Sequence, residues 1–197
     1  LVKTLTSSRP DLLREAWKLG ITKEFLPEFD LAMETTQETV HHMYTVGEHI
    51  LHTLLEVRPD RILRLTMLLH DIGKPYMKTM DADGVAHFKG HPEKSSELAN
   101  EILHRLKFDN DTIRKVTKLV RYHDHRMPVT PAHVRRAVHE IGEDLFPLYL
   151  EVRRADVAAQ SMYQHKEKVA DIDGVEKLYH EIMERKECVS LKMLAVT

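Results

Sequence analysis

The chain has 197 residues, of which 42% are apolar and 30% charged, and its formal net charge is −2. This length argues against two large independent domains, and the near balance of charges excludes a global basic field that would attract nucleic acid or an anionic membrane. Only 7 Gly and 8 Pro interrupt a sequence rich in good helix formers, so we expect an almost entirely α-helical protein.

The cysteine content and the absence of long apolar runs bear on location. The single cysteine, Cys188, cannot form an internal disulfide, which fits a reducing compartment. No apolar run approaches the roughly 18 residues that cross a bilayer, and the N-terminus lacks the apolar region of a signal peptide. We expect a cytoplasmic protein with no membrane partner. Because the chain begins with Leu1 rather than Met and ends without a closing helix cap, we also expect it to be a piece of a longer protein.

The first quarter of the chain predicts helices separated by a linker. Start and stop signals predict one helix between Ser8 and Gly20 and a second, short helix over residues 22–26. Weak periodicity over residues 27–37 predicts a linker. Apolar residues at helical spacing then predict a helix over residues 39–56.

The next helix is expected to begin at its N-cap Asp60 and to end in the sequence LLHDIGKP, residues 68–75, where Gly73 and Pro75 are stop signals. Residues 76–90 predict a loop with a tight turn, because they contain Asp-Ala-Asp-Gly. Further helices are expected over residues 92–106, 111–122, 131–141, 144–164 and 173–186. Four methionines fall on apolar stripes and are expected in the core: Met43, Met67, Met162 and Met183.

The strongest chemical pattern combines His49, the adjacent His70 and Asp71, and the distant Asp156. Neighbouring helical residues diverge by about 100°, so His70 and Asp71 can converge on one ion only where space opens beyond their helix. A helix C-terminus provides this space, and its dipole favours a cation. Two imidazoles and two carboxylates, without a thiolate, suit a divalent ion such as Mn, Fe, Co, Ni or Mg, and also admit Zn.

Two further histidines extend this pattern. If Asp71 bridged two ions roughly 3.5–4 Å apart, His91 and His123 would be natural ligands of the second. The alternative for each is a helix-end histidine satisfied by a backbone carbonyl. For His41 and His42, contact with solvent or the linker is favoured over a place beside the site, and the remaining histidines are expected on the surface or in packing roles.

A His, a His-Asp doublet in a helix-ending LLHDIGKP and a distant Asp resemble the HD superfamily of metal-dependent phosphohydrolases. The segments HHMYTVGEHIL, HFKGH, LKFDNDTIRKVTKLVRYHD and VRRADVAAQS are similar to the C-terminal HD portion of bacterial tRNA CCA-adding nucleotidyltransferases, often labelled poly(A) polymerase-like. The resemblance implies an all-α HD-type helical bundle over residues 39–165. A helical connector would precede it over residues 1–38, and a C-terminal helix with a truncated following segment would occupy residues 166–197. The family's nucleotide-transferring head would lie upstream of Leu1.

Carried over to this sequence, the resemblance implies a site with one or two divalent metal ions. The implied ligands are His49, His70, Asp71 and Asp156 for one ion, with His91 and His123 completing a second. Asp71 and Lys74 would serve catalysis. Lys74 would suit a substrate phosphate, and Arg153 would orient Asp156 or meet a phosphate oxygen. The implied chemistry is hydrolysis of a phosphate ester, with the ion polarising the phosphoryl oxygen.

Three functions remain open. The first is a phosphohydrolase module that acts on nucleotides or RNA ends, as a cyclic phosphodiesterase, nucleotidase or phosphatase, within a CCA-adding or poly(A)-adding parent. The second is a non-catalytic module that positions tRNA or forms a homodimer. The third is a free-standing HD phosphohydrolase for small nucleotides, against which the absent initiator Met argues. Arg114, Lys118 and Arg121 are candidate contacts to tRNA phosphates, although such a basic run is more often the solvated side of a helix.

Overall fold

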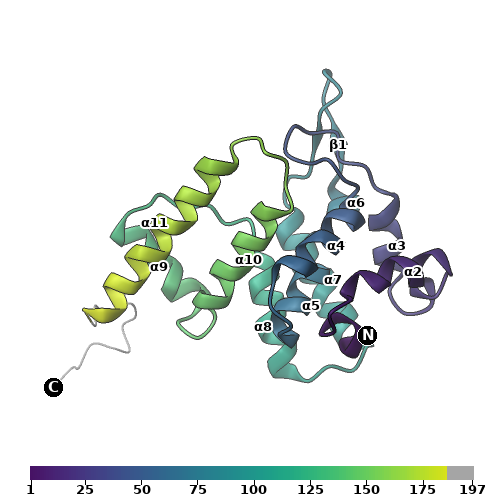
Figure 1. Ribbon diagram of the computed structural model, residues 1–197, viewed down its shortest axis with the longest axis horizontal. Coiled ribbons are helices and arrows are strands. Elements are labelled where there is room, and N and C mark those ends of the chain that lie inside the picture. Colours follow the sequence, from purple (N-terminus) through teal and green to yellow (C-terminus); the bar gives the residue numbers. More distant parts are fainter. Residues whose placement is uncertain (186–197) are drawn as a thin grey trace.

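The computed structural model describes residues 1–185, and nearly all of their regular structure is helical (Figure 1). The predicted all-α fold class is therefore confirmed. Among the described residues, no helix is both long and apolar enough to cross a membrane. Cys188 and the expected end of the last helix, Lys186, lie outside the described residues.

The elements follow the chain in a simple order, with helices interrupted by one small hairpin. They are α1 Val2–Leu5, a 3-10 helix Pro10–Leu12, α2 Leu13–Lys18, a 3-10 helix Thr22–Glu24, α3 Pro27–Glu34, α4 Val46–Glu56, α5 Arg61–Leu69, α6 Lys74–Met77, β1 Thr79–Met80, β2 Ala86–His87, α7 His91–Arg105, α8 Asn110–Tyr122, α9 Pro131–Ile141, α10 Phe146–Ala158 and α11 His165–Glu184.

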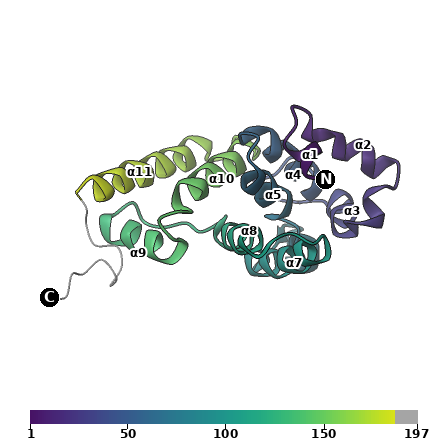
Figure 2. The same cartoon turned by 90° about the horizontal axis from the view of Figure 1, so that it is seen from below.

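Apolar side chains gather in two buried clusters that meet at α10. The larger joins α1 to α5 with α7, α8 and part of α10, and it includes Phe29 and Leu54. The smaller lies among α8, α9, α10 and α11 and includes Ile172. Figures 1 and 2 show α9, α10 and α11 together on one side of the molecule. Helix α10 contributes to both clusters, with Val152 in the larger and Val157 in the smaller.

Side-chain caps set the starts of three helices that lead to the candidate site. Thr45 accepts a hydrogen bond from the Glu48 backbone N–H at 3.2 Å and so begins α4. Asp60 accepts from two N–H groups in the first turn of α5, and Asp109 does the same for one in α8. These bonds satisfy donors that a helix leaves without partners at its start.

The Thr45 cap also shows why the prediction of a helix over residues 39–56 is wrong in its first part. Helix α4 begins at Val46, and residues 39–45 follow an irregular path. The predicted linker over residues 27–37 is wrong as well. Most of it forms α3, because Phe29, Ala32 and Met33 lie on one face of a helix and are buried in the larger cluster.

The ends of α10 and α11 also differ from the predicted ranges. Helix α10 ends at Ala158 rather than near residue 164, because the chain then turns and Ser161 bonds to residues 40 and 41. Helix α11 begins at His165 rather than near residue 173, since Val169 and Ile172 already pack on the smaller cluster.

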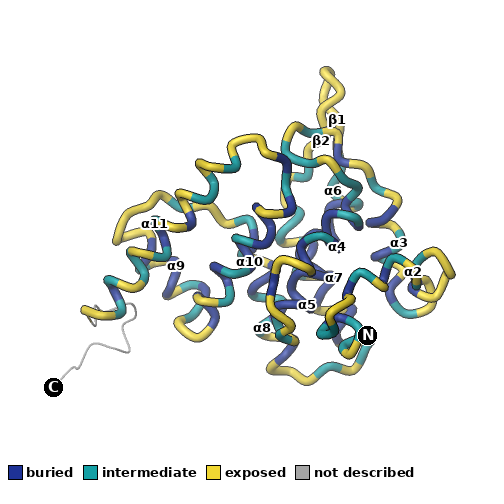
Figure 3. The backbone as a smooth tube through the Cα atoms, in the orientation of Figure 1, coloured by how far each residue is buried: buried dark blue, intermediate teal, exposed yellow. Residues whose placement is uncertain are grey.

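Residues 76–90 hold more order than the predicted loop. They complete the short α6 and form an antiparallel hairpin of β1 and β2. The expected tight turn is present: Asp81 accepts from the N–H groups of Asp83 and Val85, and Gly84 has a φ of 77°. Figure 3 shows this turn as an exposed projection.

The core prediction for the methionines is correct for Met67, which is fully buried. It is wrong for Met43 and Met162, which are 66% and 76% exposed because both lie outside helices. Met183 is partly buried.

Gly73, in the turn between α5 and α6, lies directly against the first turns of α7. A Cβ atom added to Gly73 would lie 2.5 Å from the Ser95 backbone nitrogen and 2.9 Å from the His91 carbonyl oxygen. The Gly73 N–H also donates to Ser95 Oγ at 2.9 Å. A side chain at this position would therefore push α7 away from the segment that follows α5.

We expect Gly73→Ala to lower the free energy of unfolding by about 1–3 kcal/mol, the usual cost of overpacking a rigid contact. Urea denaturation would measure the change. Gly174→Ala is the control, since its Cβ would meet only the side chain of Val129, with Cγ1 at 2.7 Å, on a residue that is 40% exposed. That control should lose less stability, because no backbone atom has to shift and Ala favours a helix by about 1 kcal/mol over Gly. Equal losses in both variants would show that α7 does not constrain position 73.

Candidate metal centre

Six side chains that the sequence predicted as ligands lie together, and we call them the His-Asp cluster. They are His49 in α4, His70 and Asp71 directly after α5, His91 at the start of α7, His123 directly after α8 and Asp156 in α10. All are buried except His91, whose side chain is 12% exposed. The cluster is therefore assembled from five separate helices or helix ends.

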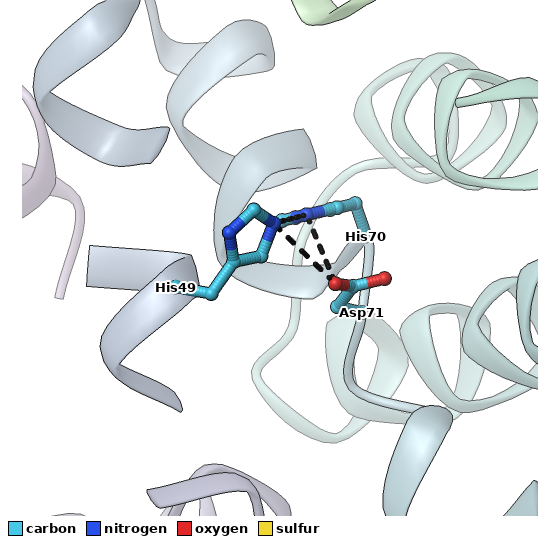
Figure 4. A group of neighbouring side chains, drawn as sticks. All are labelled: His49, His70 and Asp71. Carbon is cyan, nitrogen blue, oxygen red and sulfur yellow. Dashed lines mark hydrogen bonds and ion pairs between the residues drawn. The ribbon is translucent and has the colours of Figure 1, made fainter. Parts of the chain in front are cut away.

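His49, His70 and Asp71 form the first half of the cluster (Figure 4). His49 Nε2 lies 3.3 Å from His70 Nε2, and each of these nitrogens lies 3.5 Å from Asp71 Oδ2. Asp156 approaches from α10, with its Oδ1 3.0 Å from His49 Nε2 and 3.8 Å from His70 Nε2. Two imidazoles and two carboxylates thus face one small volume.

His91 and His123 form the second half with the other oxygen of Asp71. Asp71 Oδ1 lies 3.4 Å from the Nε2 atom of each histidine, and the two Nε2 atoms are 3.2 Å apart. Each half offers three atoms close enough together to hold a metal ion. Asp71 presents one oxygen to each half, which is the arrangement of a carboxylate that bridges two ions.

Backbone carbonyls fix the tautomer of all four histidines. The Nδ1 atoms of His49, His70, His91 and His123 lie 3.3, 2.7, 2.8 and 2.7 Å from the carbonyl oxygens of Ala159, Met67, Phe88 and Val120. A carbonyl only accepts hydrogen bonds, so each Nδ1 carries the proton and each neutral imidazole presents an Nε2 lone pair to the interior.

This donor set fits a divalent cation. The two close pairs of Nε2 atoms bring lone pairs face to face, and such pairs need a shared cation or proton between them. Both oxygens of Asp71 are buried and accept no hydrogen bond of good geometry from any described residue. Neutral imidazole nitrogens held by a bond at the opposite ring nitrogen are the usual ligands of metals in proteins.

The charge states of the cluster residues also favour the binding of a divalent cation. Burial opposes ionisation of Asp71, but the Lys74 ammonium and the neighbouring imidazoles outweigh it and hold the pKa of this carboxyl well below its usual range. Burial likewise opposes ionisation of Asp156, yet its close contact with the His49 ring holds its pKa low. Burial lowers the pKa of His70 to about 4. Burial also opposes a charge on His123, but Asp71 raises its pKa overall. Two carboxylates are therefore ionised although both are buried.

Lys74 is buried beside Asp71 and is the nearest cation to the cluster. Its Nζ lies 2.6 Å from Asp71 Oδ2, donates to Gln37 Oε1 at 2.9 Å and lies 3.4 Å from His42 Nε2. Burial beside this ammonium lowers the pKa of His42 to about 2, so His42 is neutral there. The ammonium therefore partly balances the charge of Asp71.

A cavity of about 440 Å³ connects the cluster to the surface, and we call it the entrance cavity. Its wall includes the cluster residues Asp71, His91, His123 and Asp156, with Lys74, His41, Lys89 and Arg126 among the cationic or titratable groups around them. The predicted phosphate contact Lys74 therefore lines the opening through which a substrate would enter.

The other predicted contacts lie elsewhere. Arg153 donates to the His123 carbonyl oxygen at 3.1 Å and lies 3.5 Å from Asp124, so it holds the end of α8 in place. The remaining three, Arg114, Lys118 and Arg121, lie on α8 outside the entrance cavity. Arg114 pairs with Asp111 at 3.0 Å, which is typical of a solvated helix surface.

Sequence reasoning missed Gln37 and Gln160 beside the cluster, and it favoured contact with solvent or the linker for His42, which instead lies against His49 and Lys74. Gln37 and His42, which contact Lys74, lie in segments predicted as a linker and as the start of a helix. Gln160 donates to Asp156 Oδ2 at 3.0 Å. Its spacing of four residues after Asp156 was a usable signal, whereas the approach of residues 37 and 42 depends on tertiary structure.

The pairing of Lys74 with Asp71 predicts a stability difference between two neighbouring lysines. In the metal-free chain, Lys74→Met should lower the free energy of unfolding by roughly 3–5 kcal/mol, because it leaves a buried carboxylate without its ammonium. Lys78→Met is the control. Lys78 pairs with Glu38 at 2.7 Å at the surface, where loss of an ion pair costs about 1 kcal/mol or less.

Denaturation in the presence of a chelator would measure both variants. Equal small losses would mean that the Lys74 ammonium does not balance the charge of Asp71.

Comparison with protein families finds that the HD domain family matches residues 39–158, more than half of the chain. The chain is 37% identical over 163 residues to an A-adding tRNA nucleotidyltransferase of Deinococcus radiodurans and 34% identical over 163 residues to a CC-adding tRNA nucleotidyltransferase of Thermus thermophilus. Each alignment covers 79% of this chain and 37% of the relative, so the chain spans little more than a third of their length.

A more distant relative is a bifunctional uridylyltransferase/uridylyl-removing enzyme of Streptomyces coelicolor, 26% identical over 179 residues, which are 81% of this chain and 20% of that protein. The matched family range begins before His49 and ends after Asp156, so it contains the whole His-Asp cluster. The chain belongs to the HD domain family.

Proposed function

We propose that this chain is a metal-dependent phosphohydrolase module that acts on phosphate esters of nucleotides or RNA ends. The observation that carries the proposal is the convergence of four Nε2 lone pairs on the two oxygens of a buried, ionised Asp71. The names of the two tRNA nucleotidyltransferase relatives support a further proposal, that the module works within such a parent.

In this proposal each half of the His-Asp cluster would hold one divalent ion, and Asp71 would contribute one oxygen to each half. His49, His70 and Asp156 complete one half, while His91 and His123 complete the other. A donor set of imidazole nitrogen and carboxylate oxygen suits Mn, Fe, Co, Ni, Mg or Zn. Bound there, a divalent ion supplies a Lewis acid that polarises the phosphoryl oxygen of the ester.

The chain's own cations would bind and orient the phosphate. Lys74 lines the entrance cavity and offers a flexible ammonium next to Asp71. Arg126 and Lys89 are exposed on the same wall and would attract an anionic substrate. Arg153 is a positioning residue in this scheme, because its hydrogen bond to the His123 carbonyl steadies the turn that carries a ligand.

The two-ion arrangement predicts a change in metal stoichiometry. Equilibrium dialysis followed by elemental analysis should find two ions per chain, and His91→Ala should reduce this to one, because it removes a ligand from one half only. His104→Ala, on the exposed face of the same helix, is the control and should leave the stoichiometry unchanged. One ion in all three proteins would overturn the bridging role of Asp71.

Catalysis would require the bridging carboxylate. Hydrolysis of 2′,3′-cyclic AMP should fall at least about 100-fold in Asp71→Asn, since loss of partners behind metal ligands already costs about 10–100-fold. Asp111→Asn, an exposed carboxylate on α8, is the control and should retain full activity. The assay would be run with Mn, Ni, Co and Mg in turn.

A second candidate is a tRNA-positioning module with a metal site that does not turn over, in which Arg114, Lys118 and Arg121 would contact phosphates. The tRNA relatives favour it, and so does the position of these three side chains on one helix. Stoichiometric metal without hydrolysis by the unmodified chain under any of the four ions would replace the phosphohydrolase proposal with this one.

A further inference from the structure

A second cavity, which we call the α10–α11 cavity, lies beside the metal centre. It has a volume of about 280 Å³ and is enclosed by α10, α11 and the segment that joins α8 to α9. Its size is near the lower end of ligand pockets, which span roughly 300–1,000 Å³. It contains no residue that we have assigned to metal binding except Asp156.

The α10–α11 cavity adjoins the entrance cavity. Asp124, Arg126, Asp156 and Gln160 line both spaces. Asp156 faces the metal centre through Oδ1, 3.0 Å from His49 Nε2, while its Oδ2 accepts from Gln160 at 3.0 Å. A molecule with one end at the metal centre could therefore extend past Gln160 into the α10–α11 cavity.

The lining of the α10–α11 cavity combines apolar walls with polar groups. The apolar part comes from Met127, Leu150, Val157 and Ile172. Such walls suit the faces of a planar ring, which gains from burial without needing hydrogen bonds there.

Polar side chains lie in the same wall. Gln164 can both donate and accept, and Asp171 can accept. Both residues are exposed to solvent at the mouth of the cavity, and among the described residues neither side chain has a hydrogen bond or ion pair of its own. A ring that has donors and acceptors on its edge can place its faces against the apolar wall and its edge toward these polar groups, whereas an acyl chain would offer them no hydrogen bond. Nucleobases have this chemistry.

We propose that the α10–α11 cavity receives the nucleobase of the substrate. This inference rests on the proposed phosphohydrolase function, which puts the phosphate at the metal centre. It adds a binding site for the base, so nucleoside phosphates and RNA ends with a terminal base should be preferred over phosphate esters without one. The base supplies binding energy that simple phosphate esters lack.

The first test needs no variant. Isoleucine methyl groups of the full chain would be labelled with carbon-13, and the Ile172 signal would be assigned with Ile172→Val. Adenosine, which has no phosphate, should shift the Ile172 methyl signal in a saturable way and leave that of Ile182 unchanged. Ile182 is buried on the same helix outside the cavity. A titration with no shift at Ile172, or with equal shifts at both residues, would overturn the inference.

The second test compares affinities. Ile172→Trp would fill the cavity, and Ile182→Trp is its matched control in the same apolar cluster. Calorimetric titration with adenosine 3′-monophosphate should show at least tenfold weaker binding in Ile172→Trp alone. Inorganic phosphate should bind equally well to all proteins that stay folded. Unchanged nucleotide affinity in a folded Ile172→Trp protein would contradict the proposal.

The two proposals fail in different ways. Binding of adenosine at Ile172 without hydrolysis of any ester would retain the base site and remove the phosphohydrolase function. Hydrolysis of nucleotides and of glycerol phosphate with equal KM, and no response of Ile172 to adenosine, would retain the function and remove the base site.

Discussion

The structure depends on the bond from each cluster histidine to a backbone carbonyl. Without that bond an imidazole is free to rotate or to change tautomer, and its Nε2 lone pair no longer has a defined direction. Three of the four bonds reach back three residues: His70 to Met67, His91 to Phe88 and His123 to Val120. Met67 and Val120 lie in the last turns of α5 and α8, where carbonyls have no partner further along the helix, so a histidine placed just after the turn can use one of them. Phe88 lies instead in the segment between β2 and α7, and His91 is the first residue of α7.

His49 follows a different pattern, and it connects distant parts of the chain. Its Nδ1 lies 3.3 Å from the Ala159 carbonyl, and its Nε2 lies 3.0 Å from Asp156, both more than a hundred residues away in sequence. Helix α10 therefore meets α4 through two atoms of one ring. The same helix packs its apolar residues into both buried clusters. The position of Asp156 is consequently set by the packing of the whole molecule.

Features that depend on neighbouring residues in the sequence could be predicted, whereas features that depend on contacts between distant segments could not. The His-Asp doublet and the stop residues after it are local, so its place at a helix end could be predicted. The gathering of His91, His123 and Asp156 around it came from the family resemblance, because composition and spacing carry no information about which helix ends meet. Residues 39–45 were misassigned because Met43 matches the helical periodicity of the residues that follow, although α4 begins only after its N-cap Thr45. The contact of Lys74 with Gln37 could not be predicted either, since it depends on the tertiary approach of residue 37, whereas the contact of Lys74 with Asp71 spans only three residues.

Helix α10 contributes side chains to both buried apolar clusters, and this links the metal centre to the partial unfolding of the protein. Helix α11 packs on both α9 and α10, and α10 contacts α4 through the ring of His49. An ion bound by Asp156 together with His49 and His70 would connect α10 to α4 and to the end of α5. Partial unfolding that detaches α10 from α4 would then have to release the metal first. Occupancy of the site would therefore set the rate at which the amide hydrogens of α10 exchange with solvent.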